Sequence, residues 1–312
     1  MLAPLRNFVP WREKHLEMFE KSIELAAEFT RPVNSILRTY GGNKIIPGSS
    51  TLFFVNDQGY AITCKHVIDF ITSAEKINQQ YTAFKLEREK IPRDGKYKAR
   101  LKGLETKYNY SANSIIQVLV RFVDCVDSMS GFTCYTHPGY DLGVIKFNDF
   151  GRLHYSGFAR FLKDGSTIKQ GKYLCRLGFP FPEFTNYTYN QQTDQMEWTN
   201  TGIHHSPRFP IDGMVTRFLS EENKIMGIEL SSPGLRGQSG GPLFDVSGVV
   251  YGMQYSTKHL HLGFDLVNKE ILVETKPVKV SDYSFLHLGQ CIHVDVIKEF
   301  LTEKKISFQE AE

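Results

Sequence analysis

The stretch from Leu235 to Met253, LRGQSGGPLFDVSGVVYGM, places one serine between glycines and follows it with a proline and two short apolar runs. Gly-Gln-Ser-Gly-Gly at 237–241 is typical of a loop that presents a reactive serine, because glycines let the backbone bend sharply around it. Two local structures fit this pattern. The serine lies either on a turn from a strand into a helix or on a loop that leads into another strand.

The residues on either side of Ser239 favour the loop between strands. Residues 232–236, Ser-Pro-Gly-Leu-Arg, precede it as a loop, and Gly240-Gly241-Pro242 cannot begin an ordinary helix. An esterase of the α/β-hydrolase type stays an alternative, because such enzymes need an acid and a histidine after the serine and Asp265 and His287 are available. The local pattern nevertheless indicates a β-rich hydrolase.

Short apolar runs broken by turn residues extend over most of the chain and predict an all-β core. Residues 49–55 and 60–64 predict a hairpin around the turn at 56–59. Further strands are expected at 114–123, 142–147, 172–179, 213–219, 224–230, 242–246 and 248–255. Strands and helices do not alternate, which argues against a parallel α/β sheet.

Three helical regions are expected outside this β core. Apolar residues at helical spacing predict amphipathic helices at about 11–29 and 293–305. Residues 72–112 contain ten Lys or Arg against five Asp or Glu, a net charge of +5, and predict a helical insertion. Within it, Tyr81, Phe84 and Leu86 belong to the apolar side of a first helix, and 97–104 form a second.

A histidine and an aspartate precede Ser239 in the order that a Ser-His-Asp triad on β-strands requires. His66 follows the strand in GYAITCKHVID and is the candidate general base; Asp141 begins DLGVIKF and is the candidate acid. Asp69, Asp124 and Asp127 are rivals for that acid. Backbone N–H groups of Gly237 and Ser239 are the candidate oxyanion hole.

The chain resembles the trypsin-like serine peptidases of the chymotrypsin fold, and among them the bacterial HtrA-type branch. The resemblance rests on the segments GSSTLFFVNDQGYAIT, TCKHV, DLGVIKF, GFP, GMVT and GQSGGPLFDVSGVVYGM, in that order. It implies two antiparallel six-stranded β-barrels with the triad between them, and it carries the triad to His66, Asp141 and Ser239. It also places the oxyanion hole at Gly237 and Ser239.

The chain departs from the family pattern in three places. The peptide-binding PDZ module common in HtrA-type proteins is not expected, and the insertion at 72–112 lengthens the interval from His66 to Asp141. Gln238 replaces the aspartate that pairs with a new N-terminus in digestive trypsins, so activation by such a cleavage is not expected. The substrate pocket, by resemblance, is formed by Pro233, Arg236, Gln254, Tyr255 and Ser256. No acid lies at its base, which favours a small or medium neutral side chain.

Composition restricts the compartment and the partners. The net charge of +3 on 312 residues argues against nucleic-acid binding, and no segment is long and apolar enough to span a membrane. Five cysteines without paired spacing favour free thiols in a reducing compartment, so we expect a cytoplasmic protein. His259 and His261 lack a third metal ligand, and His204-His205 is a poor chelate, so neither a metal nor another cofactor is expected.

The expected organisation is an N-terminal helical extension (1–29), a first barrel (30–158) with the insertion 72–112, and a second barrel with a terminal helix (159–312). The expected function is that of a cytoplasmic endopeptidase that cleaves a specific protein through an acyl-enzyme. The insertion is either a solvated helical hairpin or a docking surface for a regulatory or acidic protein partner, and these two interpretations together are favoured over a nucleic-acid contact. A catalytically silent scaffold that binds protein partners is the alternative.

Overall fold

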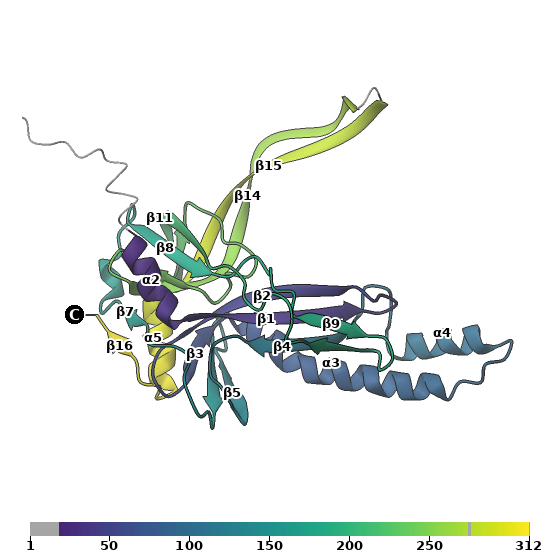
Figure 1. Cartoon of the computed structure of the whole chain (residues 1–312). Helices are drawn as coiled ribbons and strands as arrows, with labels where there is room; N and C mark the ends of the chain where they lie inside the picture. Colours follow the sequence, from purple (N-terminus) through teal and green to yellow (C-terminus); the bar gives the residue numbers. More distant parts are fainter. Residues whose placement is uncertain (1–18, 274–275, 312) are drawn as a thin grey trace, which may run out of the picture.

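The computed structural model describes residues 19–273 and 276–311 (Figure 1). The first described helix is α2 (Glu20–Phe29), and the earlier part of the helix expected at 11–29 lies outside the described residues. This helix ends at Phe29 as the sequence indicates, because Pro32 cannot continue a helix. Ala26 and Phe29 are buried against the body of the protein.

The first sheet is antiparallel and six-stranded, in the order β4-β1-β2-β3-β6-β5. Its strands are β1 (Thr30–Thr39), β2 (Ile45–Phe54), β3 (Tyr60–Thr63), β4 (Ile115–Phe122), β5 (Gly131–Thr136) and β6 (Gly143–Asn148). The expected hairpin is β2 and β3, with Phe53 opposite Ile62. The sequence analysis did not identify β1 and β5 as strands.

The second sheet closes on itself, because its six antiparallel strands run β13-β8-β11-β12-β15-β14 and β13 also pairs with β14. These strands are β8 (Tyr173–Gly178), β11 (Phe209–Glu221), β12 (Lys224–Leu230), β13 (Pro242–Phe244), β14 (Val249–Val273) and β15 (Lys276–His293). The short strand β7 (Arg160–Phe161) pairs in parallel with β14, and β16 (Gln309–Glu310) pairs in parallel with the other edge of β7. The all-β double-barrel fold is confirmed; the domain limits at 29 and 158 stay a prediction.

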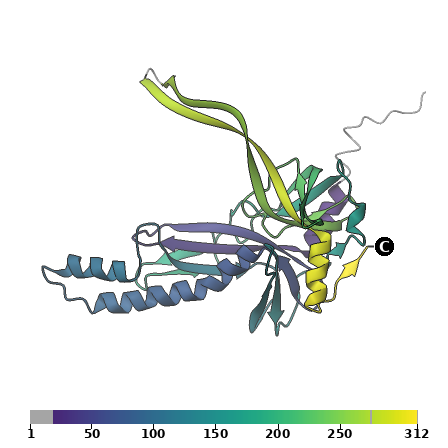
Figure 2. The same cartoon turned by 180° about the vertical axis from the view of Figure 1, so that it is seen from behind.

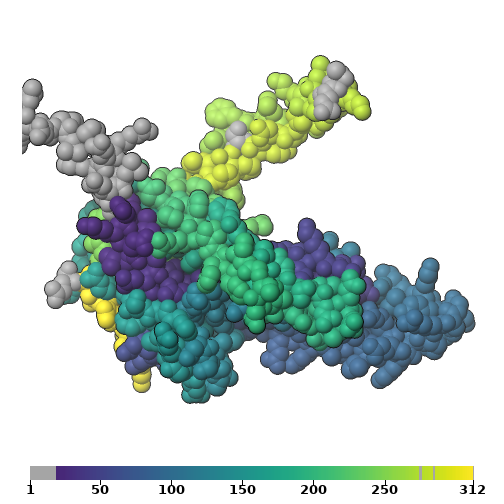
Figure 3. All heavy atoms as spheres, viewed as in Figure 1, coloured from purple at the N-terminus to yellow at the C-terminus, as the bar shows by residue number. Residues whose placement is uncertain are grey.

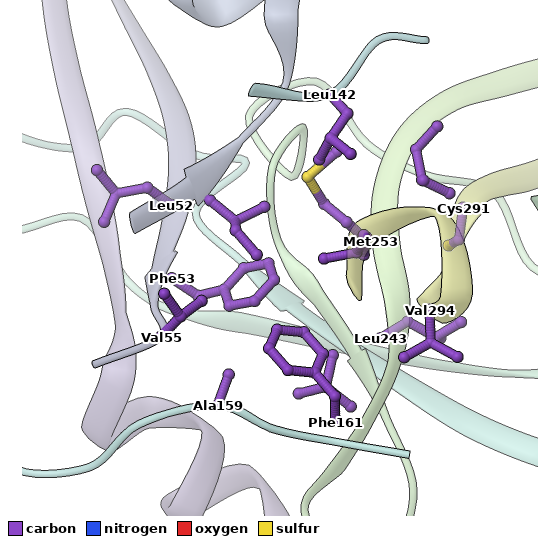
Figure 4. Packing of buried hydrophobic residues seen from close by; sticks show 14 of the residues in the cluster. Leu52, Phe53, Val55, Leu142, Ala159, Phe161, Leu243, Met253, Cys291 and Val294 are labelled. Carbon is purple, nitrogen blue, oxygen red and sulfur yellow. The ribbon is translucent and has the colours of Figure 1, made fainter. Parts of the chain in front are cut away.

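One continuous hydrophobic core joins the two sheets (Figure 4). Phe53 of β2 and Phe161 of β7 are fully buried, and their ring centroids lie 6.4 Å apart. Met253 of β14 and Val294 of α5 (Val294–Glu303) belong to the same cluster. The two barrels are therefore held against each other by apolar packing, which fixes the relative positions of residues from both.

The insertion forms a pair of helices, α3 (Lys65–Glu89) and α4 (Tyr97–Lys107). Helix α3 begins at Lys65 rather than at 72, so His66 lies in its first turn. Tyr81 and Phe84 are buried as expected, whereas Leu86 is 55% exposed. Leu86 lies in a helix as predicted, and its side chain is exposed because α4 and β4 cover only part of the surface of α3.

Smaller elements complete the chain. The hairpin of β9 (Tyr187–Asn190) and β10 (Gln195–Trp198) packs over the first sheet, and η1 (Gly165–Thr167) precedes β8. The terminal helix α5 buries its apolar residues in the core, as its spacing indicates. Among the described helices, none has both the length and the apolar character needed to cross a bilayer.

Strands β14 and β15 continue far beyond the barrel as a two-stranded arm (Figures 1 and 2). Figure 3 shows the arm as a narrow projection from the body. Its pairing shifts after His261 and after Leu266, next to Gly263 and Asn268, which have φ angles of +78° and +51°. Large apolar side chains on the arm are exposed, including Phe264 at 77%. The sequence indicated only residues 248–255 as a strand, so the arm was missed.

Removal of the outer arm should leave the barrels intact. We expect a chain in which Asn-Gly replaces 262–284, joining the paired residues His261 and Phe285, to unfold within about 3 °C of the parent, because the arm adds little to the core. Differential scanning calorimetry measures this. A fall of 10 °C or more would contradict it, and replacing 95–96 in the exposed α3–α4 turn by Asn-Gly is the control.

Candidate active site

Asp141 holds His66 through both of its carboxylate oxygens. Asp141 Oδ2 lies 2.6 Å from His66 Nδ1, and Oδ1 accepts the backbone N–H of His66 at 2.9 Å. That N–H belongs to the first turn of α3, where backbone donors have no partner within the helix. Asp141, just before β6, therefore holds both the backbone and the imidazole of His66 at the start of α3.

This arrangement leaves His66 Nε2 free to act as a base. With the carboxylate at Nδ1, the proton of the neutral ring lies on Nδ1 and the lone pair on Nε2. Burial alone would raise the pKa of Asp141, but hydrogen bonds from the His66 side chain and backbone outweigh it and lower the pKa. Asp141 is therefore ionised throughout the neutral range.

The rival aspartates are engaged elsewhere. Asp69 pairs with Lys65 one turn earlier on α3, at 2.5 Å. Asp127 accepts backbone N–H groups in a turn, and Asp124 lies 3.4 Å from His205. Of the four candidate acids, Asp141 is the one that contacts His66.

Glycines shape the loop that carries Ser239. Gly237 has φ +93°, and a Cβ there would lie 2.6 Å from the carbonyl oxygen of Phe179. Gly240 has φ +87°, and a Cβ there would lie 2.1 Å from the carbonyl oxygen of Thr51. Neither position has room for a side chain. The loop enters β13 at Pro242, as expected for a loop between strands.

Gln254 brings the serine loop and the histidine helix together. Its carbonyl oxygen accepts the N–H of Gly240 at 2.8 Å and the thiol of Cys64 at 3.4 Å. Gly240 directly follows Ser239, and Cys64 caps the helix that carries His66. The half-buried Ser239 and the half-exposed His66 are therefore on adjoining segments from the two barrels.

The candidate oxyanion hole is open. Among the described residues, the backbone N–H groups of Gly237 and Ser239 have no protein acceptor. Gln238 is fully buried; its amide donates to the carbonyl of Phe209 and accepts the N–H of Leu235, both at 3.0 Å. The glutamine thus fixes the loop without the ion pair that an aspartate would need.

Thr51 is a positioning residue that the sequence analysis missed. Its hydroxyl donates to the carbonyl of Gly237 at 2.7 Å, and its N–H donates to the carbonyl of Ser239 at 3.0 Å. The same hydroxyl accepts the N–H of Phe179 at 3.2 Å. Its local sequence gives little signal, because Thr51 follows Gly-Ser-Ser in β2 and resembles the end of that polar run before Leu-Phe-Phe.

Loss of the Thr51 hydroxyl should lower turnover more than substrate affinity. We expect Thr51→Val to reduce kcat by about 10- to 100-fold, because the Gly237 carbonyl loses its donor and the loop shifts. Steady-state kinetics on a peptide ester measure this, with Thr51→Ser as the rescue. Thr133→Val on the exposed face of β5 is the control. An unchanged kcat would show that the serine loop keeps its active geometry without the hydrogen bond from Thr51.

The candidate pocket residues lie on two neighbouring segments, the loop before Ser239 and strand β14. Pro233, Arg236 and Tyr255 are at least partly exposed, as is Ser256, whereas Gln254 is buried. The hydroxyl of Thr257 donates to the carbonyl of Gly234 at 2.8 Å, so the two walls touch. Behind them lies Arg176 on β8, a residue that the sequence analysis did not select.

Within the described ranges of the chain, the one cluster of potential metal ligands is part of the candidate active site. Ligand atoms of Cys64, His66 and Asp141 lie within 4.8 Å of one another, but burial raises the pKa of the Cys64 thiol well above its ordinary value. A protonated thiol is a poor ligand. His259 Nδ1 lies 2.5 Å from Nδ1 of His287, across the arm, and His261 pairs instead with Asp265.

All five cysteines are free, and Cys64, Cys125, Cys175 and Cys291 are buried. A cavity of about 1170 Å³ lies between α3 and strands β4 and β5. Its lining includes Asn78, Val120 and Phe132, and His66, Asp141 and Ser239 are not part of it. The cleft between the barrels, rather than this cavity, holds the candidate chemistry.

An antiparallel double barrel with a histidine, an aspartate and a serine loop at the junction of its halves defines the chymotrypsin-fold class of peptidases. Residues 50–253 match the trypsin-like peptidase domain, and the chain belongs to this family. The chain therefore carries a trypsin-like peptidase domain, as the resemblance indicated.

Solved structures similar to this chain include HtrA-type proteases. HtrA-type protease AlgW with tripeptide is 14% identical, with a TM-score of 0.45, covering 92% of this chain and 62% of that one. The Rv3671c protease from M. tuberculosis in its active form is 11% identical, with a TM-score of 0.44 and coverage of 100% and 97%. The chain thus spans about 62% of the length of the AlgW chains. A comparison with curated proteins gives no match.

Proposed function

We propose that this peptidase cleaves a protein substrate through an acyl-enzyme, with Ser239 as nucleophile, His66 as general base and Asp141 as the group that orients it. The observation that carries this proposal is the double contact of Asp141 with His66, which leaves Nε2 as the acceptor. His66 takes the proton of Ser239 as the hydroxyl attacks the scissile carbonyl.

The tetrahedral intermediate places its negative oxygen against the N–H groups of Gly237 and Ser239. Each such donor is worth about 3–4 kcal/mol when it is removed from an oxyanion hole. His66 then returns the proton to the leaving amine, and water releases the acyl group by the reverse sequence. No other group is required for proton transfer in this scheme.

We also propose that the substrate is a specific protein, that a regulatory protein binds the insertion, and that the peptidase is cytoplasmic. Exposed basic residues lie at Lys96, before α4, and at Lys98, Arg100 and Lys102 in its first turns, and they are suited to an acidic protein. Such a partner would compete with Asp94 for Arg100 and with Glu105 for Lys102. A helix of 25 residues is about 37 Å long, so α4 lies far from His66 at the start of α3. A protein that binds α4 therefore affects the cleavage of large protein substrates, which can reach both α4 and His66, and leaves the cleavage of small peptides unchanged.

Labelling with a fluorophosphonate tests the proposed function. Such a probe forms a covalent bond with a serine only where a base and an oxyanion hole activate it. We expect one adduct per chain, mapped to Ser239 by mass spectrometry of a digest. A folded chain that acquires no adduct would instead support a scaffold that binds protein partners.

A further inference from the structure

A buried guanidinium lies behind the candidate substrate pocket. The side chain of Arg176 is fully buried. Its Nη2 donates to the hydroxyl of Ser232 at 2.6 Å and to the carbonyl oxygens of Ser232 and Pro233 at 3.2 and 3.0 Å. Its Nη1 donates to Oε1 of Gln254 at 2.6 Å. One guanidinium thus connects the loop before Ser239 with the strand on the other side of the pocket.

No carboxylate of residues 19–273 or 276–311 forms an ion pair with this guanidinium. All of its acceptors are uncharged, its Nε has no acceptor, and none of the ion pairs in the described part of the chain includes it. Burial raises the pKa of the neighbouring thiols of Cys175 and Cys291 to about 12, so both stay neutral. The Asp212 carboxylate interacts with Arg176 only at longer range and is exposed to solvent. A buried charge without a counter-ion is costly, which makes this site a strong attractor for an anion.

The guanidinium joins the two segments to which the resemblance assigns the substrate pocket, through Pro233 on one side and Gln254 on the other. A Cβ on Gly289 would lie 2.0 Å from Arg176 Nη1, and a Cβ on Gly234 would lie 2.3 Å from Nε2 of Gln254. Glycine at both positions therefore makes room for these two polar groups. The Gln254 amide has the length and the acceptor oxygen of a glutamate side chain but carries no charge.

We propose that the pocket accepts an acidic side chain, so that the peptidase cleaves after glutamate or aspartate, with Arg176 as the residue that selects it. The inference rests on the proposed function and adds its substrate class. A carboxylate that enters the pocket takes the place of Gln254 Oε1 on Nη1 and supplies the missing counter-ion. This preference replaces the neutral side chain expected from the sequence.

The charge of the pocket also acts against basic side chains. Arg236, three residues before Ser239, is exposed and takes part in no ion pair among the described residues. A substrate lysine or arginine would meet the positive charges of Arg176 and Arg236 without an acid between them. Repulsion of this kind discriminates between substrates as effectively as attraction.

A series of peptides that differ only in the residue before the cleaved bond tests the preference. The full chain is assayed at low salt with peptide amides that carry Glu, Asp, Gln, Ala, Val or Lys at that position. We expect kcat/KM for Glu to exceed that for its neutral isostere Gln by about 10- to 100-fold, with Lys the slowest. Equal rates for Glu and Gln, or a faster rate for Ala or Val, would overturn the proposal.

Two variants tie the preference to Arg176. Gln254→Glu places a carboxylate on the guanidinium inside the protein, so the Glu-to-Gln ratio should fall to about 1. Arg176→Met removes the charge at similar length and should give the same ratio. If Arg176→Met fails to fold, the test rests on Gln254→Glu, because an ion pair between the new glutamate and Arg176 should keep the chain stable. Gln192→Glu, on the exposed turn between β9 and β10, is the matched control and should retain the parent ratio.

The outcomes separate this inference from the proposed function. Fluorophosphonate labelling at Ser239 together with no acidic preference would overturn the inference and leave the peptidase function. A preference for Glu that persists in Gln254→Glu would show that another group selects it. A folded chain with neither labelling nor cleavage would overturn both.

Discussion

Ser239→Ala should abolish turnover, with a loss of about 10⁶-fold in kcat, because the variant retains the base and the oxyanion donors but has no nucleophile. The fold should persist, since the backbone of Ser239, rather than its side chain, accepts the hydrogen bond from Thr51. Cleavage of a peptide ester and fluorophosphonate labelling measure the two losses. Thermal unfolding should stay within about 2 °C of the parent.

Ser247→Ala provides a matched control for this change. Ser247 lies in the exposed turn between β13 and β14, in the same barrel as Ser239, and its hydroxyl contacts only Asp245. We expect its kcat and its labelling to equal those of the parent. Labelling that survives in Ser239→Ala would mean that another serine is the nucleophile.

Local sequence was sufficient to predict the loops and strands where backbone geometry restricts the residue type. Gly237 and Gly240 have positive φ angles and no room for a Cβ, and Pro242 excludes a helix. The loop could therefore be predicted from these residue types alone. The hairpin at 49–64 was equally clear from its alternating apolar residues and its turn. Both features depend on contacts within a few residues.

Features that depend on distant contacts could not be predicted. Thr51 acts on Gly237, which is 186 residues away, and Arg176 acts on Gln254, which is 78 residues away. No local pattern marks either residue as the partner of these distant groups. The outer parts of β14 and β15 were missed for a different reason: they lie outside the core, so no burial pattern marks them as strands.

The arm has a direct connection with the pocket. Ser256 and Thr257, where β14 leaves the barrel, pair with Gln290 and Gly289 of β15. Thr257 also holds the opposite wall through the carbonyl of Gly234. One wall of the pocket, Gln254 to Ser256, thus lies on the same strand as the arm, and Thr257 connects that strand to the other wall. A movement of the arm relative to the barrel would change the pairing of Ser256 and Thr257 with Gln290 and Gly289.

Asp141→Asn should leave the fold intact and lower kcat by about four orders of magnitude, the size of effect typical of a triad aspartate. An amide at this position donates a hydrogen bond to Nδ1 of His66, which moves the ring proton to Nε2. A ring protonated at Nε2 cannot accept the proton of Ser239. Asp69→Asn is the matched control on the other side of His66, and an equal loss in both variants would mean that Asp141 is not the orienting acid.

The stability of the same variant should depend on pH in a defined direction. The pKa of Asp141 is lowered in the folded protein, so its contribution is fully present above the ordinary value of about 3.9 and is lost as the pH falls through the folded value. Urea unfolding of the parent and of Asp141→Asn from pH 7 to pH 3 measures the difference. The parent should be the more stable at pH 5–7, and the two should converge below about pH 4, because a protonated Asp141 offers His66 no charge. A difference that stays constant over this range would show that the hydrogen bonds of Asp141, rather than its charge, hold the imidazole in place.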